Sequence, residues 1–284
     1  MITASIVTYK TNIEELKKVL TCTADSIVEI IYVIDNSPVD ELKIISEYSD
    51  KIIYIFNNVN LGYGKAHNIA IRKSIEKQAK YHIVINPDIY FNEGVIETLS
   101  EFMDSNIDVG LVMPKVLYAN GEIQYLCKLL PTPIDLIGRR FIPFKKYIND
   151  RDVRYELRFT DYQTIMEVPS LSGCFMFIRT DILSKTGGFD ERYFMYAEDL
   201  DLCRKINKIA KNIYFPHVSI YHRYAKESYN NLRLLKYHII SAIKYFNKWG
   251  WFFDNERTKV NREIRKVRDY TESKSCTRFK NTDV

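Results

Sequence analysis

The stretch Glu29-Ile-Ile-Tyr-Val-Ile-Asp35-Asn36-Ser37-Pro38 decides the fold class of this chain. Its first part is a short run of β-branched and aromatic residues, which is typical of a β-strand. The run ends in Asp35–Pro38, whose residue types favour a tight turn. The stretch therefore predicts a strand that stops abruptly and leaves polar side chains at its carboxyl end.

Further strands and helices alternate on both sides of this stretch. Because the connections between them are short, the pattern predicts an α/β sandwich with a largely parallel sheet. The predicted strands cover 2–8, 29–35, 52–56, 81–86, 109–116 and 168–179. The predicted helices cover 13–20, the segment from the Asp35–Pro38 turn to about residue 48, 65–79 and 94–104. A hairpin-like segment is expected at 118–127. The locally basic region 131–166 is expected to be irregular, as a mobile or acceptor-side loop.

The composition is that of an ordinary globular protein. The chain has 284 residues, of which 46% are hydrophobic and 27% charged, and this length suits one large domain or a domain with an appendage. Its apolar runs fall short of the roughly 20 residues that span a bilayer. Its N-terminus lacks the basic region of a signal peptide. The five cysteines are scattered and odd in number, which argues against a disulfide framework or a zinc cluster and favours a cytoplasmic protein.

The net charge of +5 is concentrated near the C-terminus. Residues 223–284 hold 15 Lys and Arg against 7 Asp and Glu, or +8, which leaves 26 against 29, or −3, for residues 1–222. Such a basic tail suits nucleic acid, anionic lipid or simple solubility, and the pattern does not choose among them.

A helix beginning near Asn230 is predicted to be amphipathic. Its apolar arc holds Leu232, Leu235, Ile239, Ala242, Ile243 and Phe246, with lysine and arginine opposite. We favour a helix packed on the core by this arc. The alternative is a helix on a membrane surface, anchored by Trp249, Trp251, Phe252 and Phe253. The segment from about Lys259 onward is polar and is expected to be frayed.

Polar clusters follow four of the predicted strands, at Thr8-Tyr9, Asp35–Ser37, Asn60–Gly64 and Asn86–Asp88. In open α/β sheets the ligand binds beyond the carboxyl ends of the strands. The four clusters are therefore expected to meet at one edge of the sheet and form a binding site.

The second chemistry-bearing stretch is Gly187–Arg204, which places Asp190, Glu198, Asp199 and Asp201 among aromatic residues. Aromatic neighbours and adjacent carboxylates can raise the pKa of an acid towards the value that a general base needs. This stretch is therefore a candidate catalytic segment.

Other motifs exclude several enzyme classes. The Gly62-x-Gly64 pair lacks the third glycine of a dinucleotide fingerprint, and neither the P-loop nor the GxSxG pattern occurs. Cys174 is expected to be structural, as are His67 and His82. Taken alone, His222 is more often structural too, and His217 is its weaker rival as a ligand.

Taken together, these residues resemble a family 2 glycosyltransferase with the GT-A fold, in the branch that includes bacterial rhamnosyltransferases of cell-surface polysaccharide assembly. The resemblance covers about residues 2–230 as an ordered series of motifs. These are Ser5–Tyr9, Val33–Ser37, Asn60–Gly64 with Asn68, Ile85–Asp88, Leu171–Phe175, Gly187–Arg204, and Val218–His222 followed by Ser228. Asn86 stands where a strict DxD metal motif has its first acidic residue, so Asp88 is the carboxylate that remains.

The resemblance implies roles for these residues. Asp199 is the expected general base, and Glu198 orients it or contacts the acceptor. Asp88 and His222 are expected to hold Mn²⁺ or Mg²⁺. Contacts to the nucleotide sugar are expected from Thr8, Tyr9, Asp35, Asn36, Asn60, Gly62, Lys65, Asn68, Asn86 and Asp88. Asp190 is given a structural role, and Asp201 is expected to pair with Arg204, three residues further along a helix.

The implied activity is inverting transfer of a sugar, with dTDP-L-rhamnose as the favoured donor and a UDP-hexose or UDP-galactofuranose as alternatives. The implied acceptor is a saccharide, expected to be lipid-linked as in an O-antigen or capsule intermediate, and the protein would contact an anionic membrane peripherally. We expect a catalytic domain over 1–225, with a nucleotide-sugar half (1–115) and an acceptor half (116–225), before a basic helical extension (226–284). The oligomeric state stays open.

Three rival functions carry less support. A nucleotidyltransferase would need a glycine-rich basic loop, which Ser5–Lys10 does not offer. A non-catalytic binding subunit of the same fold would have no reason to keep Asp88, Glu198-Asp199 and His222 together. A nucleic-acid binder rests on the basic tail alone, so nucleic acid is not an expected partner.

Overall fold

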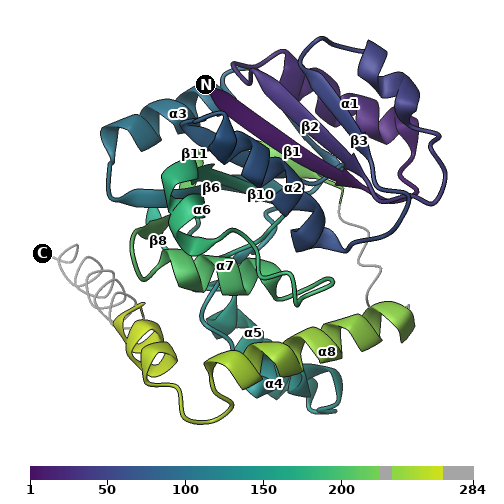
Figure 1. The fold of residues 1–284 in the computed structure, drawn as a ribbon. Coiled ribbons are helices and arrows are strands. Elements are labelled where there is room, and N and C mark those ends of the chain that lie inside the picture. The colour runs from purple at the N-terminus through teal and green to yellow at the C-terminus, as the bar shows by residue number, and fades with distance from the viewer. Residues whose placement is uncertain (224–231, 265–284) are drawn as a thin grey trace, which may run out of the picture.

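The structure, a computed structural model, describes residues 1–223 and 232–264 (Figure 1). Within these residues the core is a nine-stranded sheet in the order β3-β2-β1-β4-β10-β6-β11-β5, with β8 pairing on β11. Six of the nine strands run in one direction, and β5, β8 and β10 run against them. The predicted α/β fold with a mostly parallel sheet is confirmed.

The strands follow the hydrophobic runs of the sequence, and a separate pair forms a small second sheet. The central strands are β1 (Ile2–Thr8), β2 (Ile30–Asp35), β3 (Ile52–Phe56), β4 (Tyr81–Ile85), β5 (Ile89–Phe91), β6 (Val109–Leu117), β8 (Met166–Glu167), β10 (Phe175–Arg179) and β11 (Lys211–His222), and the second sheet pairs β7 (Cys127–Lys128) with β9 (Ser170–Leu171).

The helices cover the sheet and extend one end of the molecule. They are α1 (Ile13–Ala24), α2 (Tyr63–Glu76), α3 (Val95–Ser105), α4 (Pro133–Leu136), α5 (Lys145–Tyr155), α6 (Thr180–Thr186), α7 (Glu198–Ile206) and α8 (Leu232–Trp249), with 3₁₀ turns η1 (Lys43–Glu47) and η2 (Gly138–Arg140). Helix α2 packs across β1 and β2 and against α6. Helices α4, α5 and α8 lie together at the end of the molecule away from β1–β3 (Figure 1).

Strand register brings the polar strand ends together. In the parallel pair β1–β2, Thr8 lies opposite Asp35. At the other side of the sheet, β11 pairs antiparallel with the short strand β5, and His222 lies opposite Ile89. This second pairing sets His222 beside Asp88, the residue just before β5.

Three expectations about secondary structure are wrong. Region 131–166 is not an irregular loop, because it contains α4, η2 and α5; Thr132 and Asp135 cap each other at the start of α4. The expected strand over 168–179 is divided into β9 and β10, with Gly173 in the connection. The expected helix up to residue 48 is only the 3₁₀ turn η1, followed by Tyr48.

Helix α8 packs on the body of the protein, as favoured from the sequence. Ala242, Tyr245 and Phe246 are buried in a cluster with residues of α4, of α7 and of the segment before α7. The buried face differs from the predicted arc, because Leu232 is 84% exposed and Ile243 is 38% exposed. In the part of the chain that the structure describes, helices suited to crossing a membrane are absent.

The chain remains ordered beyond Lys259. Residues 255–264 are helical, and Arg257 and Asn261 are buried. Asn261 forms two hydrogen bonds with the backbone of Leu130, each 2.9 Å long. The expectation that this segment is frayed is therefore wrong up to residue 264. Residues 265–284 lie outside the described residues, as does Ser228 of the last quoted motif.

Candidate active site

Asp35 organises the ends of the first three strands. Its Oδ1 accepts hydrogen bonds from the Thr8 hydroxyl (3.0 Å) and from the Ser37 backbone NH (2.9 Å), and its Oδ2 accepts one from the Tyr54 hydroxyl (2.8 Å). The carboxylate is fully buried. It therefore shapes this edge through its neighbours, while Tyr9, 43% exposed, lies at the surface beside it.

The loop before α2 joins this edge through two asparagines. The Asn36 amide donates to the Gly62 carbonyl (3.3 Å) and lies 3.5 Å from Asn60 Oδ1. Asn60 Oδ1 also accepts from the Gly62 backbone NH (3.0 Å). The predicted contact residues Thr8, Asp35, Asn36, Asn60 and Gly62 thus form one connected cluster.

Lys65 and Asn68, also expected near the nucleotide, lie outside this hydrogen-bonded cluster. Lys65 is exposed on the first turn of α2. Asn68 is buried, and its amide exchanges two hydrogen bonds with the backbone of Phe189, both 2.9 Å long. In this structure Asn68 ties α2 to the segment that leads towards α7.

Asp88 and His222 come together at the opposite side of the sheet. The Nε2 atom of His222 lies 3.4 Å from Oδ2 of Asp88. The histidine is almost fully buried, and the carboxylate is 28% exposed. A carboxylate oxygen and an imidazole nitrogen, atom types that can bind a metal ion, therefore lie close together at a point that is open to solvent on the Asp88 side.

Gln124 fixes the tautomer of this histidine. Its Nε2 donates to the carbonyls of His222 (2.8 Å) and Leu117 (3.3 Å), which can only accept. Its Oε1 consequently faces His222 Nδ1 at 3.0 Å as an acceptor. Nδ1 must then carry the proton, and in the neutral ring the lone pair is on Nε2, facing Asp88.

Asp199 is held by two backbone amides at the start of α7. The Gly173 NH donates to its Oδ2 (3.0 Å), and the NH of Leu200 donates to its Oδ1 (2.8 Å). Because these donors belong to two different segments, they fix the orientation of the carboxylate. Remaining lone pairs on both oxygens are left for a further donor.

Tyr63 connects the two parts of the site. Its hydroxyl donates to the Gly173 carbonyl (2.6 Å) and lies 3.1 Å from Oδ1 of Asn86. A continuous path therefore runs from the Asn86–Asp88 turn through Tyr63 and Gly173 to Asp199. Burial raises the pKa of Tyr63, and the charge of Glu198 adds to the shift, so the phenol stays protonated and donating.

Sequence reasoning missed both Tyr63 and Gln124. Tyr63 stood inside the quoted loop Asn60–Gly64, because the predicted helix began at residue 65 while α2 begins at Tyr63. Gln124 lies in a segment read only as a hairpin, and the sequence carries no sign of its contact with a residue 98 positions later.

Glu198 differs sharply from its neighbour. It is 5% exposed, and its Oε2 has no hydrogen-bond partner among the described residues. Burial raises its pKa to about 8, and the charge of Asp199 contributes. The two residues before it, Tyr196 and Ala197, both have positive φ (69° and 64°), a conformation that non-glycine residues keep only where the surrounding structure imposes it.

The remaining carboxylates of this stretch have structural partners. Asp190 binds Arg192 and Lys248, and the fully buried Asp201 accepts hydrogen bonds from Lys248 and the Trp249 indole. The structural role predicted for Asp190 is confirmed. The predicted pair of Asp201 with Arg204 is wrong, because each of these residues turns to the C-terminal segment instead.

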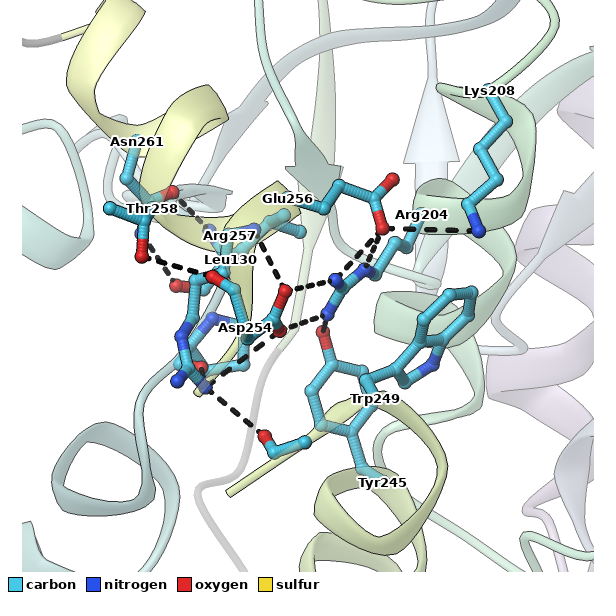
Figure 2. A network of polar contacts seen from close by, with 12 residues as sticks. Leu130, Arg204, Lys208, Tyr245, Trp249, Asp254, Glu256, Arg257, Thr258 and Asn261 are labelled. Atoms are coloured by element: carbon cyan, nitrogen blue, oxygen red, sulfur yellow. Dashed lines mark hydrogen bonds and ion pairs between the residues drawn. The ribbon is translucent and has the colours of Figure 1, made fainter. Parts of the chain in front are cut away.

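Arg204 anchors the C-terminal segment to α7 (Figure 2). Its guanidinium forms ion pairs with Asp254 (2.7 Å) and Glu256 (2.9 Å) and stacks over the ring of Trp249, 4.3 Å from its centroid. Arg204 and Asp254 are both almost fully buried. The helix that begins with Glu198 and Asp199 is thereby joined to residues 249–256.

A pocket of about 150 Å³ opens beside Asp199. Its walls come from β7, β9, α4, η2, α5, α7, the segment just before α7, and α8. A larger hollow of about 440 Å³ lies between α1 and β5, lined by Cys22 and Tyr90 among others, but it contains none of the predicted site residues. The predicted catalytic residues Glu198 and Asp199 therefore line the smaller pocket.

The other predicted residues fit the structural roles given to them. Cys174 is buried, and burial raises its pKa to about 12. His67 and His82 are fully buried and share a hydrogen-bond network with Ser5. His217 is exposed, and its ring contacts the ring of Phe215 edge-to-face.

Comparison with known proteins identifies the same family that the sequence motifs resemble. Residues 3–187, well over half of the chain, match the family model described as Glycosyl transferase family 2. The chain is 25% identical over 222 residues to the rhamnosyltransferase WbbL of Escherichia coli K12, covering 76% of this chain and 81% of that protein. It is 28% identical over 180 residues to the N-acetylglucosaminyl-diphospho-decaprenol L-rhamnosyltransferase of Mycobacterium tuberculosis, covering 58% of this chain and 57% of that protein.

Solved structures share the fold at low sequence identity. GalNAc-T7 with UDP, GalNAc and Mn²⁺ superposes with a TM-score of 0.61 at 16% identity, covering 78% of this chain and 43% of that one. Staphylococcus aureus TarS (residues 1–349) gives 0.53 at 19% identity, covering 84% and 65%. These likenesses identify the GT-A fold. Together with the family match, they lead to one conclusion: this chain is a member of glycosyl transferase family 2.

Proposed function

We propose that this chain transfers a sugar from a nucleoside diphosphate to a saccharide hydroxyl in a single displacement with inversion. The carrying observation is the position of Asp199, whose carboxylate is oriented by two backbone amides and connected through Tyr63 to the turn that holds Asp88. The matched family region ends at residue 187, before Asp199 and His222, so the roles of these two residues belong to the proposal.

Asp199 acts as the general base. The acceptor hydroxyl gives its proton to a carboxylate oxygen of Asp199 as its own oxygen bonds to the anomeric carbon. The bond from that carbon to the diphosphate oxygen breaks on the opposite face, which inverts the configuration. A positioned base of this kind contributes about 10²–10⁴-fold to a rate.

Asp88 and His222 are the residues that would hold a divalent cation. Their donor set of one carboxylate oxygen and one imidazole lone pair fits Mn²⁺, and Mg²⁺ less well. Groups of three or more metal-binding side chains are absent from the described residues, so oxygens of the donor diphosphate would complete the coordination. The cation would neutralise charge that develops on the leaving diphosphate.

For the donor we propose dTDP-L-rhamnose, supported by the names of the relatives in Escherichia coli and Mycobacterium tuberculosis. A UDP-hexose or UDP-galactofuranose is the alternative, and similarity to the hexosyltransferase Agl10 of Haloferax volcanii (26% over 214 residues) keeps it open. Thr8, Tyr9, Asp35 and Asn36 would shape the base and ribose site, and Asn60, Gly62, Lys65, Asn68 and Asn86 would approach it from the neighbouring loops.

For the acceptor we propose a lipid-linked saccharide presented at an anionic membrane surface. Basic residues between 139 and 158 and on α8 would face that surface, which suits electrostatic attachment. In this proposal residues 1–115 bind the donor and residues 116–225 the acceptor, and the extension 226–284 completes the acceptor side.

The function is tested by a thermal-shift screen of dTDP- and UDP-sugars with Mn²⁺, because a bound donor raises the melting temperature by mass action. The selected donor is then used with Asp199→Asn and Asp88→Ala. We expect Asp199→Asn to retain the donor-induced shift and lose transfer, and Asp88→Ala to lose both. Transfer at the wild-type rate by Asp199→Asn, or full activity of Asp88→Ala in EDTA, contradicts the proposal.

A further inference from the structure

The α6–α7 connection, residues 187–197, is an irregular segment that leads into the two predicted catalytic carboxylates. Because its backbone is neither helix nor strand, its carbonyl groups need hydrogen-bond donors from other segments. Its last two residues, Tyr196 and Ala197, have positive φ, and Ala197 is the residue just before Glu198 and Asp199. Contacts that impose this unusual backbone conformation therefore also fix the position at which α7 begins.

Two side chains of α8 donate hydrogen bonds to the α6–α7 connection. The Ser241 hydroxyl donates to the Met195 carbonyl (2.8 Å), and the Lys244 ammonium group donates to the Arg192 carbonyl (2.5 Å). Ser241 is only 2% exposed, whereas Lys244 lies at the surface. Of the two hydrogen bonds, the one from Ser241 is therefore the better shielded from water.

Both donors belong to one stripe of α8 that follows the α6–α7 connection. Residues at positions i, i+4, i+7 and i+11 share one face of a helix. The ring of Tyr237 packs on the ring of Phe194, with the centroids 4.6 Å apart, and Lys248 forms an ion pair with Asp190 (2.9 Å). Each residue of the stripe thus contacts the connection. The stripe consists of Tyr237, Ser241, Lys244 and Lys248.

The start of α2 holds the α6–α7 connection next to the bond from Ser241. The backbone NH of Tyr63 donates to the carbonyl of Phe194 (2.9 Å), the residue before Met195. A Cβ atom on Gly62 would lie 2.3 Å from the same carbonyl, so the loop before α2 touches the connection closely. Two neighbouring carbonyls are therefore fixed by α2 and by α8, two elements that lie far apart in the sequence.

We propose that Ser241 is a positioning residue for the transfer reaction. Its hydroxyl holds the Met195 carbonyl, and the two residues of positive φ that follow transmit this position to Asp199 at the start of α7. Ser241 does not line the pocket beside Asp199, so it acts through the backbone and not by contact with the reacting groups. The inference rests on the proposed function, because it takes Asp199 as the general base and adds the residue that keeps this base in place.

Removal of the Ser241 hydroxyl leaves the Met195 carbonyl without its donor. The α6–α7 connection then relaxes towards a less strained backbone and moves the start of α7 with it. A displacement of about 1 Å can reduce the rate of a reaction about 100-fold, even when the residues at the reacting centre are unchanged. The strand ends expected to bind the donor keep their own hydrogen bonds, so kcat should fall while the donor KM stays the same.

The test compares Ser241→Ala with the wild type in the full chain. The donor is the one that the thermal-shift screen selects, and the acceptor is N-acetylglucosaminyl diphosphate carrying an undecyl chain. We expect kcat to fall about 10–100-fold, with the donor KM and the donor-induced rise in melting temperature unchanged. The melting temperature without ligand should fall by no more than about 4 °C, the effect of one lost hydrogen bond. Ser241→Thr, which keeps the hydroxyl, should restore most of kcat.

Matched variants separate positioning from a general loss of stability. Ser26→Ala removes another buried serine hydroxyl, which donates to the Thr23 carbonyl (2.7 Å) just after α1, and it should lower the melting temperature similarly without lowering kcat. Lys244→Met should lower kcat less than Ser241→Ala, because water can replace an exposed donor, and Lys244→Arg should restore it. Lys77→Met, at the exposed residue that follows α2, is the control for the lost charge.

Hydrogen–deuterium exchange gives a readout that does not depend on activity. Peptides covering residues 190–201 should exchange faster in Ser241→Ala than in the wild type or in Ser26→Ala. Unchanged exchange would show that Ser241 does not hold the connection, and unchanged kcat despite faster exchange would show that the connection does not position Asp199. Either result overturns the inference, as does an equal loss of kcat in Ser26→Ala. Absence of transfer by the wild type instead contradicts the proposed function, and the exchange measurement still decides whether Ser241 holds the connection.

Discussion

The Oε1 atom of Gln124 lies 3.0 Å from Nδ1 of His222, and this contact determines which ring nitrogen faces Asp88. The amide of Gln124 cannot turn over without losing its two bonds to backbone carbonyls. The orientation of the histidine ring thus depends on a residue from another segment of the chain, and in the neutral ring it turns the Nε2 lone pair towards Asp88.

We predict that Gln124→Leu weakens cation binding about 10–100-fold, the usual effect of removing the hydrogen-bond partner of a metal-binding histidine. The measurement is calorimetric titration of Mn²⁺ in the presence of the selected nucleotide. Nitrogen NMR of the metal-free protein reports the tautomer of His222 independently. Gln163→Leu, at an exposed glutamine that contacts Lys115, is the control. Unchanged Mn²⁺ affinity together with an unchanged tautomer contradicts the prediction.

Gly62→Ala should destabilise the protein far more than Gly94→Ala. Both glycines have nearly the same backbone conformation (φ 84° and 85°), so both variants lose about 1 kcal/mol from positive φ alone. A Cβ atom on Gly62 would also lie 2.3 Å from the Phe194 carbonyl, whereas nothing lies within 4 Å at Gly94. Urea unfolding measures the loss of unfolding free energy in each variant. Equal losses in the two variants would show that the loop at Gly62 can shift to accommodate the added Cβ atom at little cost.

Arg204→Met should reduce the free energy of unfolding by about 3–5 kcal/mol, because it leaves the almost fully buried Asp254 without its partner. Arg192→Met removes an ion pair with Asp190 in which the arginine is 63% exposed, and it should lose under about 1 kcal/mol. Denaturant titration compares the two. A small loss in both variants would mean that the network in Figure 2 contributes little to holding the C-terminal segment.

Local patterns predicted the fold of residues 1–115 well. The strands ending at Thr8, Asp35 and Phe56 are rich in β-branched and hydrophobic residues, and their parallel order brings the polar strand ends together. The contact of Asp88 with His222 was found through a family resemblance, because nothing in the local sequence links residues that far apart. Gln124 was not predicted for the same reason, because its contact with His222 joins residues far apart in the sequence.

The chain beyond residue 115 was harder to predict because long-range packing decides its fold. Helix α5 has few buried positions, Tyr155 being its buried residue, so its sequence resembles a polar loop. The predicted strand is interrupted at Gly173, whose NH donates to Asp199 on a distant helix, a contact that the local sequence does not reveal. On α8 the periodicity located the helix, but its neighbours rotated the buried face towards Tyr245.

Acid should destabilise the protein through two buried histidines. Burial lowers the pKa of His82 to about 3 and that of His67 well below its ordinary value, while in the unfolded chain both titrate near 6.5. The unfolded state therefore takes up these protons at a higher pH than the folded state. The stabilisation from the two neutral histidines is fully present above pH 6.5 and is lost as the pH falls towards 3. Each histidine contributes about 1.4 kcal/mol per pH unit.

The slope of unfolding free energy between pH 6 and pH 4.5 measures this effect. His82→Asn should reduce the slope by about one proton, while His217→Gln, at an exposed histidine, should leave it unchanged. An equal slope in the wild type and in His82→Asn would place the acid sensitivity elsewhere.

Glu198 should make the folded protein less stable as the pH rises, which is opposite to the effect of the histidines. Burial raises its pKa to about 8 in the folded chain, against about 4.3 when unfolded. The folded state thus holds this proton more tightly, so the stabilisation is present below pH 4.3 and is lost as the pH rises through 8. Wild type and Glu198→Gln, compared by urea unfolding from pH 5 to pH 9, should diverge by about 1 kcal/mol or more per unit in this window. In the wild type alone, ionisation above pH 8 should also raise the acceptor KM, because the contact with the acceptor that we expect of Glu198 would lose its hydrogen-bond donor. Parallel pH profiles for the two proteins would show that Glu198 is ionised throughout and recognises the acceptor only as a hydrogen-bond acceptor.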